Sequence, residues 1–84
     1  MTQQSAAAIQ TWIVEYVAES LALDVAEVDV TGSFDRLGLD SVTAVGMTGA
    51  LEEWLDRRID PAIIYQFPTI ATMATALADG ASAS

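Results

Sequence analysis

The sequence contains no cysteine, no histidine and no lysine, and each absence removes a class of chemistry. Without cysteine there is no disulfide, no thiolate nucleophile and no cysteine-based zinc site. Without histidine and lysine, the usual general base, the Schiff-base amine and most ligands for transition metals are missing. The chain by itself therefore holds few of the groups on which catalysis or metal binding usually depends, and we expect no metal site.

Positive charge is also scarce. Three arginines face twelve carboxylates, which gives a formal net charge of -9. Nucleic acid is a poor partner for such a surface, because phosphate binding needs clustered lysine and arginine. A partner protein with a basic surface fits the charge, since opposite potentials guide association. Acidic charge that only keeps a small apolar domain soluble fits equally well, and composition leaves both explanations open.

No apolar run is long enough to cross a bilayer. The N-terminal stretch MTQQSAAAIQ lacks a basic region followed by an apolar one, so it does not resemble a signal peptide, and a cytoplasmic location is the default expectation. At 84 residues, of which 52% are hydrophobic, the chain can form one domain with its own core.

Four segments show the period of a helix and none alternates like a strand. We expect helices over residues 5–21, 41–56 and 61–66, and a last helix that begins after an N-cap at Thr69 and stops at Gly80. Asp60 and Pro61 form an N-cap and first-position pair for the short helix. The fold class is therefore all-α, a small four-helix bundle of three main helices and one short one.

The loop from Asp24 to Asp40 is long for so small a domain. Its apolar residues predict that it is ordered and packed onto the helices. We expect the domain itself to span residues 5–79, between a disordered N-terminus (1–4) and a flexible tail (80–84). The apolar anchors of the loop are Val28, Val30, Phe34, Leu37 and Leu39.

Two catalytic or metal-binding interpretations fail on spacing. An EF-hand that began at Asp24 would have Ala26 and Val28 where oxygen ligands are required. A nucleophile elbow at Ser41 would need glycines two residues away on each side, and those positions hold Leu39 and Thr43. Ser41 also lacks a histidine or lysine base, so another protein would have to activate it.

The simplest role for Ser41 is that of a helix N-cap, which Asp40 could fill one position earlier. Projected at about 100° per residue, the helix over 41–56 has two faces. Ala44, Thr48, Leu51 and Leu55, with Met47 at the edge, form the expected core face. The outer face is partly apolar with carboxylates at its border, which suggests a docking surface. It comprises Val42, Val45, Gly46, Gly49, Glu52 and Glu53.

Gly46 and Gly49 each cost roughly 1 kcal/mol relative to alanine in a helix interior, so we expect close approach at these positions. Either the loop of this domain or a side chain of a partner could make that approach. The sequence does not choose between the two.

The stretch FDRLGLDSVTAVGM resembles the phosphopantetheine attachment region of acyl carrier proteins, in particular the carrier domains of polyketide synthases. The core of the resemblance is Leu37, Gly38, Asp40 and Ser41, followed by Val42 where leucine is commoner. Downstream, IDPAIIYQFPTI is similar to the third helix of that family and to its aromatic-Pro-Thr entry to the last helix. The resemblance covers residues 9–77.

The resemblance implies a carrier and not a catalyst. A phosphopantetheinyl transferase would attach 4′-phosphopantetheine covalently to Ser41, and the thiol of the arm would hold an acyl group as a thioester. Asp40 would help to position the metal of the transferase, and Leu39 and Val42 would flank the site as apolar contacts. Val45, Gly46, Gly49, Glu52 and Glu53 would face the partners.

The resemblance further implies enzymes of polyketide or fatty-acyl biosynthesis as partners of a monomeric carrier. They would be of ketosynthase, acyltransferase or thioesterase type, or an acyl-adenylate ligase. Many family members carry glutamate where this chain has Gly46, and a bulkier residue at Gly49, so its partner would fit a flatter face. Two alternatives stay open: a peptidyl carrier of a nonribosomal peptide synthetase, and an unmodified helical adaptor that binds through the Val42–Glu53 face.

Overall fold

A computed structural model describes residues 4–79 of the chain. The all-α prediction is confirmed: three main helices account for most of the fold, and no strand occurs within the described range. Shorter helical segments lie between them, and two of these, η1 and α2, fall in the segment from Asp24 to Asp40 that was predicted as a long ordered loop. The elements are α1 (Ala6–Leu21), the 3-10 turn η1 (Val25–Glu27), α2 (Phe34–Leu37), α3 (Ser41–Leu55), α4 (Ile63–Gln66) and α5 (Ile70–Ala78).

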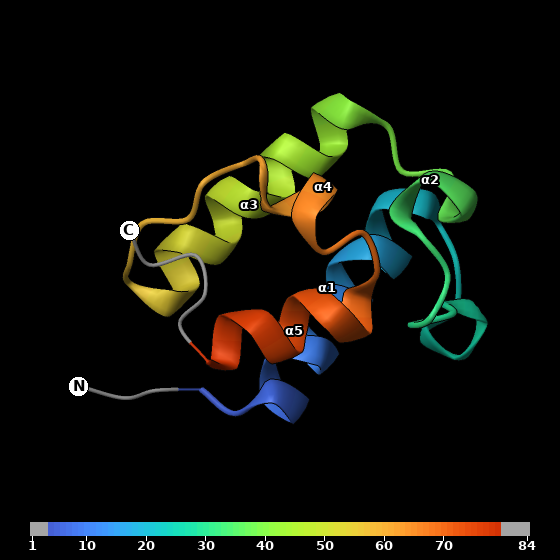
Figure 1. The fold of residues 1–84 in the computed structure, drawn as a ribbon. Helices are drawn as coiled ribbons and strands as arrows, with labels where there is room; N and C mark the ends of the chain where they lie inside the picture. Colours follow the sequence, from blue (N-terminus) through green and yellow to red (C-terminus); the bar gives the residue numbers. More distant parts are fainter. Residues whose placement is uncertain (1–3, 80–84) are drawn as a thin grey trace.

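The core lies where α1, α3 and α5 meet (Figure 1). α1 packs mainly against α5 and also contacts α3 and η1, while the short α4 fills the space between α3 and α5. Burial of these apolar side chains is the main force that holds the bundle together. The largest fully buried side chains are Ile9, Ile13, Val17, Met47, Thr48, Leu51, Ile63, Ile70, Met73 and Leu77.

The core face predicted for α3 is largely confirmed. Ala44, Thr48 and Leu51 are buried, and Met47, expected at the edge, is fully buried, whereas Leu55 is only half-buried. On α5, the apolar residues at helical spacing, Ile70, Met73, Ala74 and Leu77, are buried as well. On α1 the buried stripe includes Ile9, Ile13 and Val17.

The segment between α1 and α3 is packed, as expected. Phe34 N donates to Pro68 O at 2.9 Å, and Ala71 N donates to Val30 O at 3.0 Å, so this segment is tied to the start of α5. Ser33 caps α2 through a hydrogen bond from Arg36 N. α2 is a single turn, too short for a helical period to show in the sequence.

The start of one predicted helix is wrong. α4 begins at Ile63 and not at Pro61, because Asp60 Oδ1 accepts a hydrogen bond from Ala62 N and closes a turn before the helix. α5 begins after Thr69 as predicted, where Thr69 and Thr72 form a capping box, and its last residue is Ala78. The predicted stop at Gly80 and the tail over 80–84 lie outside the described residues, as do the first three residues of the predicted N-terminal segment.

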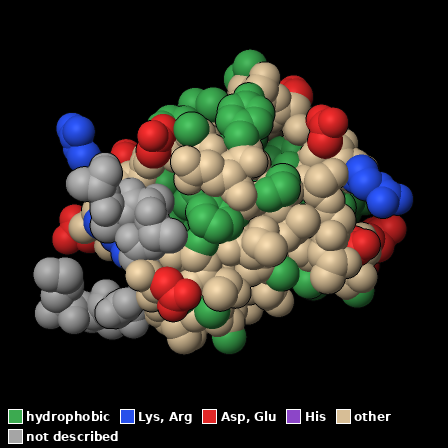
Figure 2. Space-filling view, in the orientation of Figure 1, with side chains coloured by type: hydrophobic (Ala, Val, Ile, Leu, Met, Phe, Trp, Pro, Cys, Tyr) green, Lys and Arg blue, Asp and Glu red, His purple; other side chains and the backbone are tan. Residues whose placement is uncertain are grey.

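None of the helices within residues 4–79 is long and apolar enough to span a membrane. In Figure 2, hydrophobic side chains reach the surface over the region where Figure 1 places α4, between α3 and α5. Acidic side chains lie around this apolar region. The surface therefore has an apolar area with an acidic border on the side of the molecule that carries α4.

Candidate functional site

The start of α3 is built by Asp40. Its Oδ1 accepts a hydrogen bond from Thr43 N at 2.7 Å, and its carbonyl accepts one from Ala44 N at 2.9 Å. The bond from Thr43 holds the pKa of the Asp40 carboxyl below its usual value. Asp40 is thus the N-cap, and the prediction that Ser41 fills that role is wrong.

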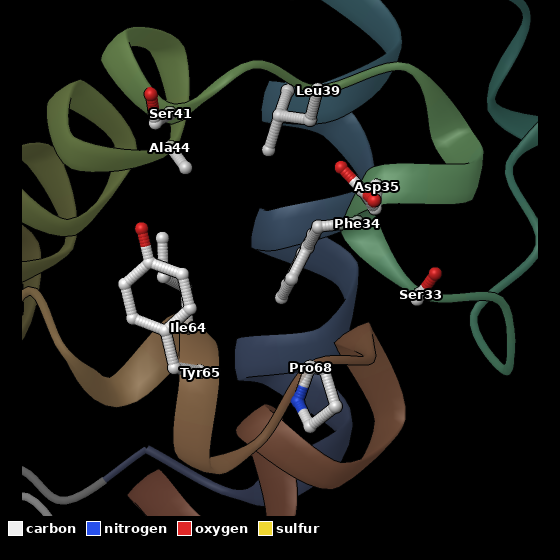
Figure 3. Close-up of a pocket in the computed structure, with 9 residues that line it drawn as sticks. All are labelled: Ser33, Phe34, Asp35, Leu39, Ser41, Ala44, Ile64, Tyr65 and Pro68. Atoms are coloured by element: carbon white, nitrogen blue, oxygen red, sulfur yellow. The ribbon is translucent and has the colours of Figure 1, made fainter.

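Ser41 is the first residue of α3 and its side chain is exposed. Its hydroxyl makes no hydrogen bond to any other described residue. Figure 3 shows it pointing outward from the helix end. Because unpaired backbone N–H groups and the helix dipole favour negative charge at this position, a phosphate on Ser41 would lie in a favourable field.

The turn before Ser41 depends on Gly38. This residue ends α2 with φ of 93°, in the left-handed region that favours glycine, and its N–H donates to Asp35 O at 3.1 Å. Leu39 N then donates to Phe34 O, which turns the chain so that Leu39 points inward. The Leu-Gly-Leu-Asp-Ser sequence therefore folds as a helix stop, a buried anchor, a cap and an exposed hydroxyl.

A pocket of about 320 Å³ opens beside Ser41. It lies between α2, α3, α4 and the segment that leads into α5 (Figure 3). Most of its wall is apolar, with Tyr65 at 74% exposure forming part of the rim. The lining residues are Ser33, Phe34, Asp35, Leu39, Ser41, Ala44, Ile64, Tyr65 and Pro68.

The two predicted apolar neighbours of Ser41 lie in different environments. Leu39 is only 5% exposed and forms part of the pocket wall, whereas Val42 is 81% exposed on the outside of α3. Leu39 is therefore reachable by a group that enters the pocket. Val42 is reachable by the surface of a partner.

Most of the predicted outer face of α3 is open to solvent. Val45, Gly46, Gly49 and Glu53 are exposed. Glu52 differs, because it is half-buried and its Oε2 accepts a hydrogen bond from Ile59 N at 2.8 Å. Its carboxylate thus binds the backbone of the loop after α3, a contact that the sequence did not indicate.

The two glycines of α3 have different surroundings. A Cβ on Gly46 would lie 3.6 Å from the hydroxyl oxygen of Tyr16 on α1, which is ordinary van der Waals contact. A Cβ on Gly49 would meet nothing within 4 Å. The loop of the domain approaches neither glycine closely, so that explanation for them is wrong for the described residues.

Two aromatic features were missed at the level of sequence. Trp12 stacks on Tyr16 and on Trp54, each with ring centroids 5.4 Å apart, and this joins α1 to α3. Tyr65 was treated only as part of a short helix, yet it is one of the most exposed large side chains and lines the pocket. Its position directly before Gln66, Phe67 and Pro68 gave no signal of exposure.

The site lacks the means to activate Ser41. The chain has no histidine or lysine, and the nearest carboxylate in sequence, Asp40, is already a hydrogen-bond acceptor for the helix. Residues 4–79 also contain no group of three or more aspartate or glutamate side chains placed to hold a metal ion. The arrangement therefore offers an accessible hydroxyl at the start of α3.

A family model described as "Phosphopantetheine attachment site" matches residues 11–77. The chain is 33% identical over 70 residues to one subunit of the phenolphthiocerol/phthiocerol polyketide synthase of Mycobacterium tuberculosis, a match that covers 83% of this chain and 4% of that protein. It is 37% identical over 46 residues to the acyl carrier protein TtuC of Teredinibacter turnerae, covering 55% of this chain and 53% of TtuC. The chain thus spans only a small part of the synthase protein and about half of TtuC.

Two solved structures are similar over nearly the whole chain. Asl1650, an acyl carrier protein from Anabaena sp. PCC 7120, superposes with a TM-score of 0.85 at 34% identity, covering 94% of this chain and 90% of its own. A free-standing peptidyl carrier protein from Acinetobacter baumannii superposes with a TM-score of 0.86 at 26% identity, covering 92% of this chain and 96% of its own.

Proposed function

From the premise that the chain belongs to the carrier-protein family with a phosphopantetheine attachment site, we propose that Ser41 is the residue that carries the group. Members of this family are carriers and not catalysts. They hold 4′-phosphopantetheine covalently, and the thiol of that group takes an acyl cargo as a thioester. The reactive sulfur arrives with the group, which agrees with a chain that has no cysteine.

The observation that supports Ser41 most directly is that its hydroxyl has no other duty. Ser5 and Ser33 cap α1 and α2, and Asp40 caps α3, so Ser41 is left exposed at the helix N-terminus beside the pocket. A transferase would move the phosphopantetheinyl group of coenzyme A onto Ser41 Oγ. A new P–O bond forms there, the bond to the adenosine bisphosphate leaving group breaks, and a base of the transferase takes the serine proton.

Three neighbours of Ser41 have proposed roles in this modification. Asp40 sets the position of Ser41 through the cap, and its exposed carboxylate is available to the metal of the transferase. Val42 gives the transferase an apolar contact. Leu39, which lines the pocket, contacts the attached arm.

Incubation with coenzyme A and a broad-specificity phosphopantetheinyl transferase tests the proposal by intact mass. We expect the mass of one phosphopantetheinyl group on the wild-type protein and none on Ser41→Ala. Ser20→Ala is the matched control, because Ser20 is also exposed and caps no described helix, and it should be modified like the wild type. An adduct that persists on Ser41→Ala would contradict the assignment.

We further propose that the partners of this carrier dock on the exposed residues of α3 and are enzymes of acyl or polyketide biosynthesis. Val42, Val45, Gly46, Gly49 and Glu53 are available for contact, whereas Glu52 contributes less because its carboxylate is occupied. The candidates are ketosynthase, acyltransferase, thioesterase or acyl-adenylate ligase types, besides the transferase. The carrier would act as a monomer in the cytoplasm, where coenzyme A and these enzymes are found.

A peptidyl carrier is the second candidate, favoured by the similarity to the Acinetobacter structure. The more identical relatives are named as acyl carrier proteins and as part of a polyketide synthase, which favours acyl cargo. Mass spectrometry of the carrier isolated with its natural cargo separates the two, because an aminoacyl adduct contains one more nitrogen than the arm alone. An unmodified adaptor is not supported by the family match.

A further inference from the structure

The pocket beside Ser41 has one charged side chain, that of Asp35. Figure 3 shows this carboxylate on the wall opposite Ser41 and Tyr65, turned toward the space between them. Asp35 belongs to α2, Ser41 to α3 and Tyr65 to α4, so three separate elements bring these groups around one cavity. The pocket therefore combines apolar walls with an acidic end.

The Asp35 carboxylate has no hydrogen-bond partner among the described residues, and no arginine lines the pocket. An ionised carboxylate can only accept hydrogen bonds. By contrast, the hydroxyls of Ser33 and Tyr65 can each donate or accept, so they do not discriminate between donors and acceptors. Asp35 is thus the group that decides which polar atoms are tolerated opposite Ser41.

The pocket is large enough for a small organic group. Its volume of about 320 Å³ is many times that needed for one water molecule, so a short acyl group fits. A group tethered to Ser41 also has an effective concentration in the millimolar range, so a weak preference of the pocket suffices to fill it.

We propose that this pocket holds a short acyl group that presents a hydrogen-bond donor, a hydroxyl or an ammonium, to Asp35. The inference rests on the proposed attachment of the arm to Ser41. A plain alkyl cargo would displace water from the Asp35 carboxylate and would offer no hydrogen bond in its place, which is unfavourable. A carbonyl or carboxylate at the same place would bring acceptor against acceptor.

The test uses the full chain loaded by a transferase from four coenzyme A thioesters: hexanoyl, β-hydroxyhexanoyl, β-aminohexanoyl and β-oxohexanoyl. The readout is the half-life of each thioester on the protein divided by that of the same acyl group on free pantetheine. This ratio cancels the different intrinsic reactivities. We expect the hydroxy and amino cargoes to be protected about threefold more than hexanoyl, a modest factor because Asp35 is exposed and water competes.

Asp35→Asn is the decisive variant, because an amide of nearly the same shape can both donate and accept. It should raise the protection of the β-oxo cargo and remove the advantage of the β-amino cargo. Glu19→Gln removes the same charge from an exposed position on α1 that does not line the pocket, and it should leave the pattern unchanged. The same order of cargoes in Asp35→Asn as in the wild type would overturn the proposal.

Salt separates the two kinds of donor. Added sodium chloride should reduce the advantage of the ammonium, which is partly Coulombic, and leave that of the hydroxyl. Equal protection of all four cargoes on a fully loaded protein would refute the pocket inference alone. Failure to load Ser41 at all, seen by intact mass, would instead refute the proposed attachment site.

Discussion

Two adjacent residues at the start of α3 have separate duties. Asp40 closes the helix end with its side chain, and Ser41 keeps a free hydroxyl at the first helical position. A serine that also served as the cap would lose that hydrogen bond when its oxygen became a phosphodiester. The arrangement lets Ser41 be modified without removing the cap from α3.

The first prediction concerns the separate roles of Asp40 and Ser41. Ser41→Ala should change the free energy of unfolding by less than about 0.5 kcal/mol, because no described hydrogen bond is lost and the surface position is exposed. Asp40→Ala should lower the urea midpoint, because it removes the N-cap. Urea unfolding followed by circular dichroism measures both. A larger loss for Ser41→Ala than for Asp40→Ala would contradict the structure.

The charge of Asp40 predicts a pH dependence. The hydrogen bond from Thr43 N lowers the folded-state pKa below the ordinary value of 3.8, so the ionised form stabilises the fold. That stability is present above the unfolded pKa and is lost as the pH falls through the folded pKa. Asp40→Asn keeps a capping side chain without this charge. The difference in urea midpoint between wild type and Asp40→Asn should be largest above about pH 4 and vanish in stronger acid; a constant difference would disprove it.

At the scale of single elements, α3 combines a well-packed inner face with an outer face that contains two glycines. Gly49 has open space around its Cβ position, so nothing within the described chain requires glycine there. At Gly46 a methyl group would only touch the Tyr16 hydroxyl. Both glycines weaken the helix without a compensating contact in the domain, which favours a partner as their reason.

Gly49→Ala should therefore stabilise the protein by about 1 kcal/mol, the difference in helix propensity between the two residues. Urea unfolding at neutral pH measures the gain, and Gly46→Ala should show a gain of the same sign. Loss of stability in Gly49→Ala would mean that the open space is filled. The rate of modification by the transferase, measured on the same variant, should fall if a partner approaches this residue closely.

Long elements were predictable, and of the short ones α4 was predicted with too early a start, whereas η1 and α2 were not predicted. The helical period of α3 gave its inner face correctly, from Ala44 to Leu51, because fifteen residues repeat the pattern several times. The four residues of α2 contain no such repeat, although Ser33 and Gly38 mark its two ends. The hydrogen bond from Ile59 N to Glu52 forms because the loop after α3 folds back onto the helix. A helical projection does not contain this tertiary contact.

At the scale of the whole molecule, the site depends on a core that holds α1, α3 and α5 together. The residues that carry the resemblance to an attachment motif are adjacent in the sequence, so they could be recognised without the fold, and the role of Ser41 stays a prediction. The pocket was not predictable in this way. Its walls come from α2, α3, α4 and the segment before α5, so it exists only after the chain has folded.

A matched pair of leucines tests the core. Leu51 is fully buried in α3, and Leu51→Ala should reduce the free energy of unfolding by about 2–5 kcal/mol. Leu23→Ala deletes the same atoms at a residue that is 37% exposed after α1, and it should cost clearly less. Chemical denaturation of both variants gives the comparison. Equal losses would contradict this packing.

The most direct test of the carrier assignment is to locate the phosphopantetheinyl group on the modified protein. Because the chain has no lysine and three arginines, trypsin releases residues 37–57 as one peptide in which Ser41 is the single serine, beside Thr43 and Thr48. Fragment mass spectrometry of this peptide after incubation with coenzyme A and the transferase should place the added mass on Ser41. The group on another residue, or a folded wild-type protein that is never modified, would contradict the account.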